Sequence, residues 1–378
     1  MDRLGIGVVG CGNIASTYLR NASLFPGIEI RVCADISPEA AERRASEFGL
    51  RALTLDQLLA ADDVDLVLNL TVPNAHFDVS MAALAAGKHV FTEKPLATTA
   101  AEGRTLVAEA KRRNLAIGSA PDTFLGAAGR LARRLMDDGA IGRVVAGTAF
   151  MMGRGMEHWH PSPQFYYQPG GGPVLDMGPY YITMLVNLLG PARRVMAMSA
   201  IGQAERLITA PGPNAGTSFS VGTPTTIMAL VEFVSGAMVT VGMSWDVFRH
   251  GNQPIELHGT EGSMRLPDPD TFGGSVALSS RGSPWHELST AEAIHGRINW
   301  PYDAPDRANY RMIGVADLAR SLREGSAPRA SGELALHVLE ILEGVLVSGA
   351  SGTSIHLDER DIRPASLSEA DAEALERA

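Results

Sequence analysis

The chain has 378 residues, 45% of them hydrophobic, a length that exceeds what one hydrophobic core usually serves and that predicts two domains. Its formal net charge of −10 repels nucleic-acid phosphates and anionic lipids, so nucleic acid is not an expected partner. Because no run reaches the roughly 18 consecutive apolar residues of a membrane span, and the beginning of the chain lacks signal-peptide features, we expect a cytoplasmic protein that does not enter a membrane.

The first third of the chain alternates apolar runs with helical patterns. Between Leu4 and Gly118 the runs are LGIGVVG, IEIRVCAD, DLVLNLT, KHVFTE and LAIGS, and the segments between them have helix-like spacing. This alternation predicts βαβ units, and therefore a doubly wound parallel sheet with helices on both faces. We expect a domain of the α/β class with the Rossmann architecture over residues 1–121.

The pattern changes after about Asp122. A helix through LARRLMDDG precedes longer strands, including TTIMALVEFVSGAMVTVGMSWD, where Ser235-Gly236 indicates a hairpin turn. Two late segments with apolar residues three and four apart predict helices that pack back onto the N-terminal domain, and the acidic tail after Ser366 is expected to fray. Residues 122–378 are expected to form a substrate-binding α+β domain with an open, mainly antiparallel sheet.

The turn after the first apolar strand has the pattern G-x-G-x-x-A, from Gly10 to Ala15. Gly10 permits a tight turn, Gly12 lets the backbone approach a pyrophosphate, and the small Ala15 allows close packing of helix on strand. Asn13 and Ile14 begin the expected helix, whose free N–H groups attract the anion. Such a turn can also bind nothing, but its place in the first of several βαβ units favours a dinucleotide site.

Asp35 ends the second expected strand, about twenty residues beyond the glycines. A carboxylate at this place accepts hydrogen bonds from the adenosine ribose of NAD and repels the 2′-phosphate of NADP. Arg43 and Arg44 follow, and they would accommodate that phosphate if the loop were arranged differently. We therefore expect NAD as the cofactor, with NADP less favoured.

Four separated motifs stand in order along the chain. They are GVVGCGNIA at the start, NLTVPNAH at residues 69–76, FTEKPLA around Glu93-Lys94-Pro95, and GGGPVLDMGPYY at residues 170–181. Together they resemble the glucose–fructose oxidoreductase, inositol dehydrogenase and rhizopine-catabolism (Gfo/Idh/MocA) family of sugar-type dehydrogenases. The resemblance covers nearly the whole chain. It implies hydride transfer between NAD(P) and a ring hydroxyl or ketone of a sugar, cyclitol or glycoside. It also implies a homodimer or homotetramer formed through the C-terminal sheet.

The second motif supplies candidate cofactor neighbours. The residues that the resemblance places near the pyrophosphate and nicotinamide half of the cofactor are Thr71, Pro73, Asn74 and His76. Ligands of open α/β sheets bind beyond the carboxyl ends of strands, which is where this turn falls. His76 has a second interpretation, as a helix-capping or solvated histidine in the first turn of a helix.

Lys94 lies in a Glu-Lys-Pro turn at the end of a strand. Oxidation of a secondary alcohol requires a base for the hydroxyl proton while hydride leaves for the nicotinamide. The family counterpart of Lys94 is the central catalytic lysine, and we expect partial burial beside the positive nicotinamide to lower its pKa. The resemblance also implies a cis Lys94-Pro95 bond and places Glu93 beside the cofactor. An ordinary surface lysine is the alternative.

Asp176 and Tyr180 are four residues apart in a helix expected to begin near Pro173, so they share one face, with Gly178 leaving room beside them. The resemblance places this face opposite Lys94 across the substrate pocket, with Asp176 binding a substrate hydroxyl and Tyr180 exchanging its proton. A lysine ammonium stabilises a phenolate. The family more often has histidine where Tyr180 stands, which leaves open whether Lys94, ranked first, or Tyr180 carries the proton. A capping Asp and a core Tyr are the alternative.

The segment GMEHWHPSPQFYYQPGGG combines aromatic residues, histidines and prolines in an expected loop. Aromatic faces with polar edges suit a sugar ring, so we expect a substrate site at His158, Trp159 and His160. Two histidines make a poor metal site, and Cys11 and Cys33 are too few for a multi-cysteine zinc site, so no metal is expected.

Two other functions stay open at this point. Relatives of the family hydrolyse glycosides while NAD is reduced and reoxidised within each turnover, and a non-catalytic sensor would keep the fold as a ligand-gated binding module. The presence of Lys94, Asp176 and Tyr180 favours an enzyme, because a pure binder needs no proton path. The particular sugar, the hydroxyl and the direction of reaction depend on loop geometry.

Overall fold

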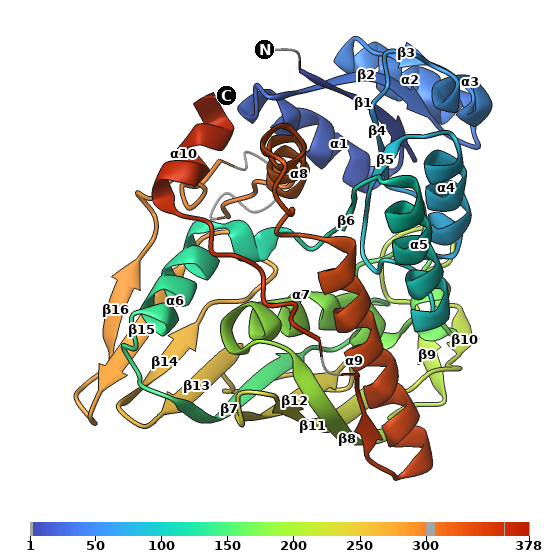
Figure 1. Cartoon of the computed structure of the whole chain (residues 1–378). Coiled ribbons are helices and arrows are strands. Elements are labelled where there is room, and N and C mark those ends of the chain that lie inside the picture. The colour runs from blue at the N-terminus through green and yellow to red at the C-terminus, as the bar shows by residue number, and fades with distance from the viewer. Residues whose placement is uncertain (1–2, 300–306, 359, 378) are drawn as a thin grey trace.

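Two β-sheets from different parts of the chain organise the molecule (Figure 1). The structure is a computed structural model of the whole chain and describes residues 3–299, 307–358 and 360–377. Within these residues the first sheet comes from the N-terminal third, and the second sheet comes mostly from the C-terminal two thirds.

The first sheet has six parallel strands among the described residues, in the order β3-β2-β1-β4-β5-β6. The strands are β1 (Leu4–Val9), β2 (Ile28–Ala34), β3 (Arg51–Ala52), β4 (Leu66–Asn69), β5 (His89–Thr92) and β6 (Ile117–Ser119). The chain runs one way from β1 to β3 and the other way from β4 to β6. The carboxyl ends of β1 and β4 therefore meet at the switch point, where doubly wound sheets bind ligands. The predicted Rossmann sheet is confirmed.

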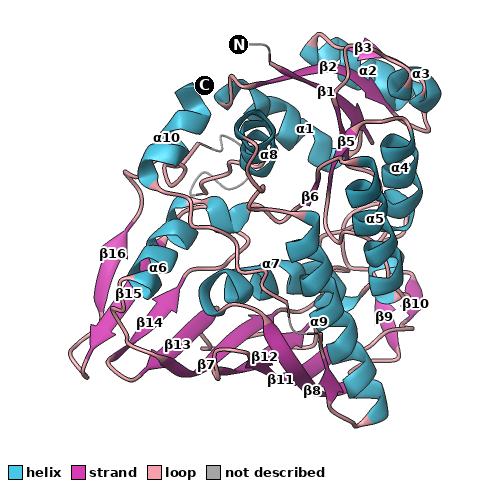
Figure 2. Ribbon diagram, viewed as in Figure 1, coloured by secondary structure: helices cyan, strands magenta, loops and turns pink. Residues whose placement is uncertain are grey.

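Helices connect these strands and cover both faces of the sheet (Figure 2). They are α1 (Asn13–Asn21), α2 (Pro38–Phe48), α3 (Leu55–Leu59), α4 (Pro73–Ala85) and α5 (Ala100–Arg113), with the 3₁₀ turn η1 (Ala22–Leu24) after α1. Helix α1 lies on one side of the sheet, and α4 packs on α5 on the other. Burial on both faces explains why the strands are almost continuously apolar.

The second sheet is mixed and mainly antiparallel, as predicted, with the order β16-β15-β14-β13-β7-β12-β11-β8-β17 in the described residues. Only β7 and β12 pair in parallel. The strands are β7 (Val144–Met152), β8 (Ala192–Ala200), β11 (Thr226–Phe233), β12 (Met238–Ser244), β13 (Ile255–Gly259), β14 (Gly262–Leu266), β15 (Ser275–Ser280), β16 (His286–Ser289) and β17 (Ile355–His356). Gly236, with φ +86°, makes the predicted hairpin turn between β11 and β12.

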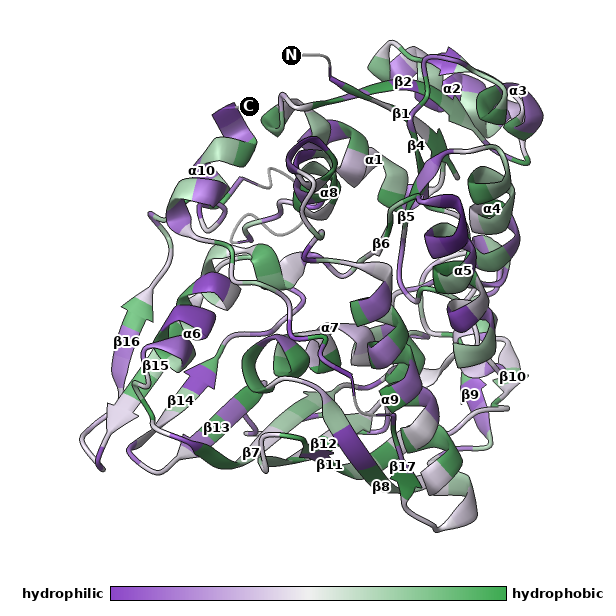
Figure 3. Cartoon of the chain, viewed as in Figure 1, coloured by the Kyte–Doolittle hydropathy of each residue, from purple (hydrophilic) through white to green (hydrophobic). Residues whose placement is uncertain are grey.

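One face of the second sheet is covered and the other is open. Helices α6 (Ala127–Asp137), α7 (Gly172–Leu189) and α9 (Gly332–Ser351) cover the inner face. Apolar side chains alternate along the strands, and the ribbon coloured by hydropathy shows hydrophobic positions on these strands and on α9 (Figure 3). The outer face exposes a set of apolar side chains, Met196, Met198, Met228, Leu230 and Met238.

The late helices join the two halves of the molecule. Helix α9 contacts α5 and β6 of the first half and α7 and β8 of the second, and α8 (Ile313–Glu324) packs on β6. By length and composition α9 is apolar enough to cross a membrane, but 61% of its apolar window is buried inside the protein, which matches its place between the sheets.

The acidic tail is not frayed, contrary to the expectation from sequence. Helix α10 (Glu369–Arg377) packs on α8, and Ala372 and Leu375 are buried. A small two-stranded sheet of β9 (Glu205–Leu207) and β10 (Ser218–Ser220) stands apart from the main sheets.

Candidate active site

The glycine-rich turn lies between β1 and α1, against the end of β4. Gly10 has φ +99°, and a Cβ at this residue would lie 2.6 Å from the carbonyl of Leu70. Only glycine therefore fits there without strain. Beside Gly12 a Cβ would meet no atom within 4 Å, so this side of the turn is open space. Asn13 and Ile14 begin α1, whose N-cap Gly12 makes no side-chain cap bond. The first N–H groups of the helix are thus available to an anion.

A second helix at the same edge also starts without a side-chain cap. Val72 is the N-cap of α4 and Pro73 and Asn74 begin it, whereas the caps of the other three described helices in this half come from Ser37, Thr54 and Thr99. Because β1 and β4 are neighbours, the two uncapped helix ends lie on one edge of the sheet. Apolar side chains stand exposed there as well, Val72 at 68% and Ile36 fully. The edge therefore offers N–H groups for a pyrophosphate and apolar surface for flat rings, which fits a dinucleotide.

Asp35 sits at the end of β2, against the glycine-rich turn. Its Oδ2 accepts a hydrogen bond from the backbone N–H of Cys11 at 2.7 Å, and its Oδ1 accepts one from Ser37 at 2.9 Å. Arg44 donates to the carbonyl of Gly12 at 3.1 Å and forms an ion pair with Glu47 at 2.6 Å. The carboxylate of Asp35 therefore stabilises the conformation of the turn and places a negative charge beside it. The guanidinium of Arg44 is already paired with Glu47.

His76 is fully buried, which rules out the solvated histidine, and it caps no helix end. Its Nδ1 lies 2.7 Å from the carbonyl oxygen of Pro95, and its Nε2 lies 3.0 Å from that of Thr71. Burial lowers the pKa of the imidazole. His76 thus links the turn after β4 to the turn after β5.

Lys94 is not an ordinary surface lysine. Its Nζ donates to the backbone carbonyl of Asp176 at 2.8 Å and to the Oδ1 of Asp176 at 2.9 Å, and the two side chains are only 17% and 19% exposed. The peptide bond between Lys94 and Pro95 is cis. Asp176 lies beyond the first turn of α7, so it is not the capping residue of the alternative interpretation. The pair is in direct contact rather than on opposite sides of a pocket.

Two opposing effects act on the pKa of Lys94 in the protein without its cofactor. Burial by itself disfavours the ammonium and lowers its pKa, but the carboxylate of Asp176 in direct contact raises the pKa well above its ordinary value. Without a cofactor the ammonium form of Lys94 is therefore favoured, and it donates its hydrogen bonds to Asp176.

Tyr180 lies on the same side of α7 as Asp176, with its side chain buried. The Nζ of Lys94 is 5.4 Å from the centre of its ring, and its hydroxyl oxygen is 3.3 Å from Nη2 of Arg311. Burial and the charge of Asp270 raise the pKa of the phenol, whereas Lys94 and Arg311 oppose the rise. The helix therefore brings Asp176 and Tyr180 to Lys94, as the spacing predicts.

Gly178 has a different role from the one expected. A Cβ at this position would lie 2.5 Å from Cδ2 of Leu342, so the missing side chain makes room for α9 and not for a substrate.

Three polar residues around this group, Tyr18, Asp270 and Arg311, were not identified from the sequence, and they surround Glu93 and Tyr180. Glu93, a predicted cofactor neighbour, accepts hydrogen bonds from the hydroxyl of Tyr18 at 2.7 Å and, through Oε2, from the backbone N–H of Lys94 at 2.9 Å. Arg311, which precedes α8, forms an ion pair with Asp270 at 2.9 Å. Tyr18, Asp270 and Arg311 come from three distant segments and lie outside the recognised motifs, so no sequence signal marks them.

The aromatic loop, residues 155–172, contacts α7 through the 3₁₀ turn η3 (Gln164–Tyr167), which contains Tyr166. Burial and the charge of Asp176 raise the pKa of the Tyr166 phenol, whereas the charge of Lys94 lowers it. The ring of His160 packs edge-on against Trp159, Phe165 and Tyr166 with centres 5.3–5.5 Å apart. Trp159 is 53% exposed. Nδ1 of His158 is buried without a partner among the described residues.

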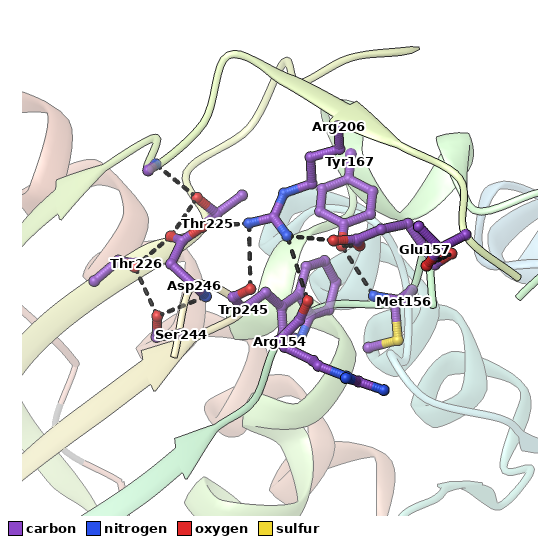
Figure 4. Close-up of polar contacts among 12 residues, drawn as sticks. Arg154, Met156, Glu157, Tyr167, Arg206, Thr225, Thr226, Ser244, Trp245 and Asp246 are labelled. Carbon is purple, nitrogen blue, oxygen red and sulfur yellow. Dashed lines mark hydrogen bonds and ion pairs between the residues drawn. The ribbon is translucent and has the colours of Figure 1, made fainter. Parts of the chain in front are cut away.

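A buried ion-pair cluster joins Glu157 of this loop to Arg206 of β9 (Figure 4). Arg206, whose side chain is 3% exposed, pairs with Glu157 at 2.6 Å and with Asp246, and its guanidinium lies 5.1 Å from the centre of the Tyr167 ring. The hydroxyl of Tyr167 donates to Glu157. Within the described residues, no three metal-ligating side chains gather in a group that would hold an ion.

Comparison with known proteins places this geometry in a family. Residues 4–120 match the model described as an oxidoreductase family with an NAD-binding Rossmann fold, and residues 130–265 match the GFO/IDH/MocA C-terminal domain.

Curated relatives span most of the chain. A dTDP-3,4-didehydro-2,6-dideoxy-alpha-D-glucose 3-reductase from Streptomyces violaceoruber is 32% identical over 90% of this chain and 94% of its own. A levoglucosan dehydrogenase from Pseudarthrobacter phenanthrenivorans is 28% identical over 70% of this chain and 73% of its own.

A solved structure of levoglucosan dehydrogenase in complex with NADH and L-sorbose superposes with a TM-score of 0.79 at 22% identity. The match covers 94% of this chain and 99% of that one, and it shows a shared fold. The two family models, the nearly full-length relative and the fold agree: this chain belongs to the Gfo/Idh/MocA family of NAD-binding oxidoreductases.

Proposed function

We propose that this chain transfers a hydride between NAD and a ring hydroxyl or ketone of a sugar, a cyclitol or a glycoside. The observation that carries the proposal is the half-buried ion pair of Lys94 with Asp176, with Tyr180 beside it, two residues beyond the end of strand β5. The relatives named for levoglucosan and for a dideoxy sugar nucleotide support a sugar-like substrate.

Each of the three side chains has a proposed task. The bound nicotinamide supplies or accepts the hydride. Asp176 orients the ammonium of Lys94 and keeps oxygen lone pairs for a substrate hydroxyl. Lys94 stabilises negative charge on the substrate oxygen, and Tyr180 exchanges the proton with it. This assignment differs from the ranking based on sequence, because a firmly protonated Lys94 is a better electrostatic partner than a base.

The proposed cofactor site uses the edge described above. The first N–H groups of α1 and the backbone at Gly12 would hold the pyrophosphate, and Asp35 would bind the adenosine ribose. Among the second-motif residues, Thr71, Pro73 and Asn74 would lie beside the cofactor. The buried His76 would act by fixing their turn.

The near-ultraviolet absorbance of reduced nicotinamide tests this function. NAD and then NADP are offered with a panel of sugars, cyclitols and glycosides to the wild type, to Lys94→Met and to the exposed control Lys111→Met. We expect reduction of NAD by the wild type and by the control, and a loss of at least about a hundredfold in Lys94→Met.

Other results of that assay point to other functions. Release of an aglycone from an aryl glycoside without accumulation of reduced cofactor would indicate the NAD-dependent glycosidase. Binding of NAD and sugar without turnover of any kind would indicate a sensor.

Three further proposals concern the whole molecule. We propose a domain boundary between residues 121 and 122, because the chain leaves the first sheet after β6 and, after a short 3₁₀ turn, forms α6. A cytoplasmic location is proposed from the composition.

A homodimer or homotetramer would bury the open face of the second sheet, which exposes Met196, Met198 and Met228. Sedimentation of the wild type and of Met198→Glu tests the assembly, and an unchanged mass would contradict this interface.

A further inference from the structure

Arg311 is the one charged group that touches the hydroxyl of Tyr180 within the described residues. Its Nη2 lies 3.3 Å from the hydroxyl oxygen of Tyr180 and 2.9 Å from Oδ1 of Asp270. The side chain of Arg311 is 14% exposed, so solvent screens these contacts only in part. Arg311 has no counterpart in any motif recognised in the sequence.

The direction of this hydrogen bond decides where the tyrosine proton can go. A guanidinium only donates, so the oxygen of Tyr180 must be the acceptor. The hydroxyl has a single proton, and no acceptor for it is found among the described residues. Within the described residues nothing competes for this proton, so it can pass to an acceptor such as a substrate oxygen.

The backbone that carries Arg311 is held in an uncommon conformation. Met312, fully buried, has φ +105°, which is rare for a residue with a side chain. The buried carboxylate of Asp122 accepts hydrogen bonds from the N–H groups of Met312 at 3.3 Å and of Gly314 at 2.9 Å. A Cβ on Gly314 would lie 2.8 Å from Cβ of Asp122. Such strain persists only where surrounding contacts enforce it, often at functional sites.

We propose that Arg311 is a positioning residue for Tyr180, which directs the hydroxyl proton towards the substrate oxygen and pairs with the phenolate that remains after proton transfer. The inference rests on the proposed function. In the direction of reduction the carbonyl carbon gains a hydride from reduced nicotinamide, and the carbonyl oxygen gains the Tyr180 proton. The products are the alcohol, oxidised nicotinamide and a phenolate beside Arg311, and oxidation reverses every transfer.

Asp270 anchors the guanidinium and also opposes the phenolate by its own charge. Removing the arginine and removing the aspartate should therefore move the ionisation of Tyr180 in opposite directions. A role in folding alone does not predict opposite signs.

The first experiment needs neither substrate nor cofactor. Tyr180→difluorotyrosine replaces the phenol by a more acidic one, whose ionisation is followed by fluorine NMR over pH in the full-length protein. We expect Arg311→Gln to raise the pKa of this phenol by about one unit or more, Arg311→Lys to raise it less, and Asp270→Asn to lower it. Arg329→Gln serves as the control, because it removes a different ion pair, to Asp317 on α8. We expect no shift in the pKa of the phenol in this variant.

The outcomes separate this inference from the proposed function. An unchanged titration in Arg311→Gln, or shifts of the same sign in Arg311→Gln and Asp270→Asn, would overturn the role of Arg311 whatever the enzyme does. If the sugar panel shows turnover, Arg311→Gln should lower kcat at least tenfold with unchanged NAD affinity, and Arg311→Lys should recover part of it. An absence of turnover in the wild type would instead contradict the proposed function and leave the titration result standing.

Discussion

Asp122→Asn should change how the stability of the protein depends on pH. Asp122 is 1% exposed, and burial raises the pKa of its carboxyl from the ordinary 3.8 to about 6. Between these values the folded protein keeps a proton that the unfolded chain has already lost, so the stability contributed by this group falls as pH rises. A difference of about two units corresponds to about 3 kcal/mol.

The asparagine variant isolates this contribution. Its amide oxygen can still accept from the backbone of Met312 and Gly314, but it carries no charge. Relative to the wild type, the variant should therefore gain about 3 kcal/mol between pH 4 and pH 7. The wild-type curve alone would not show this, because burial lowers the pKa values of His76 and His337, which acts in the opposite sense.

Urea unfolding of both proteins, followed by circular dichroism at several pH values between about 4 and 7, measures the difference. A pH-independent difference in stability between the two proteins does not affect the test, because only the change of this difference with pH reports the ionisation of Asp122. A difference in unfolding free energy that stays constant with pH, or that favours the wild type towards neutral pH, would refute the conclusion that burial raises the pKa of Asp122.

Three further predictions use matched variants. For His337, burial lowers the pKa to about 4, so the wild type should lose about 3 kcal/mol relative to His337→Gln as pH falls from about 6.5 to about 4 in the same urea experiment. Gly10→Ala strains the turn and should lower the free energy of unfolding by about 1–3 kcal/mol. Gly12→Ala should leave the melting temperature nearly unchanged, but it should weaken NAD binding at least tenfold as measured by calorimetry. Arg206→Met leaves two half-buried carboxylates without their ion-pair partner and should lower the free energy of unfolding by about 3 kcal/mol or more. Arg281→Met removes an exposed ion pair and should lower it by less than about 1 kcal/mol in thermal unfolding. Equal effects of the two variants would contradict the stabilising role of the Arg206 cluster.

The sequence alone determined the features that depend on neighbours within one element. The glycine pattern from Gly10 to Gly12 marks the dinucleotide turn because its backbone requirements are local. The four-residue spacing of Asp176 and Tyr180 places them on one helix face because helix geometry is periodic. Lys94 could be expected near a cofactor because parallel strands end at the same edge of a sheet, and the family motifs supplied its proposed role.

Only the tertiary structure decided which elements meet. Arg311 and Asp270 reach Tyr180 from segments that carry no motif, and Gly178 faces Leu342 of a helix more than a hundred residues away in the chain. The ammonium of Lys94 is stabilised by a carboxylate on another element, which raises its pKa although burial by itself lowers it. Such contacts follow from how helices and sheets pack over a shared core, and packing leaves no periodic trace in the order of residues.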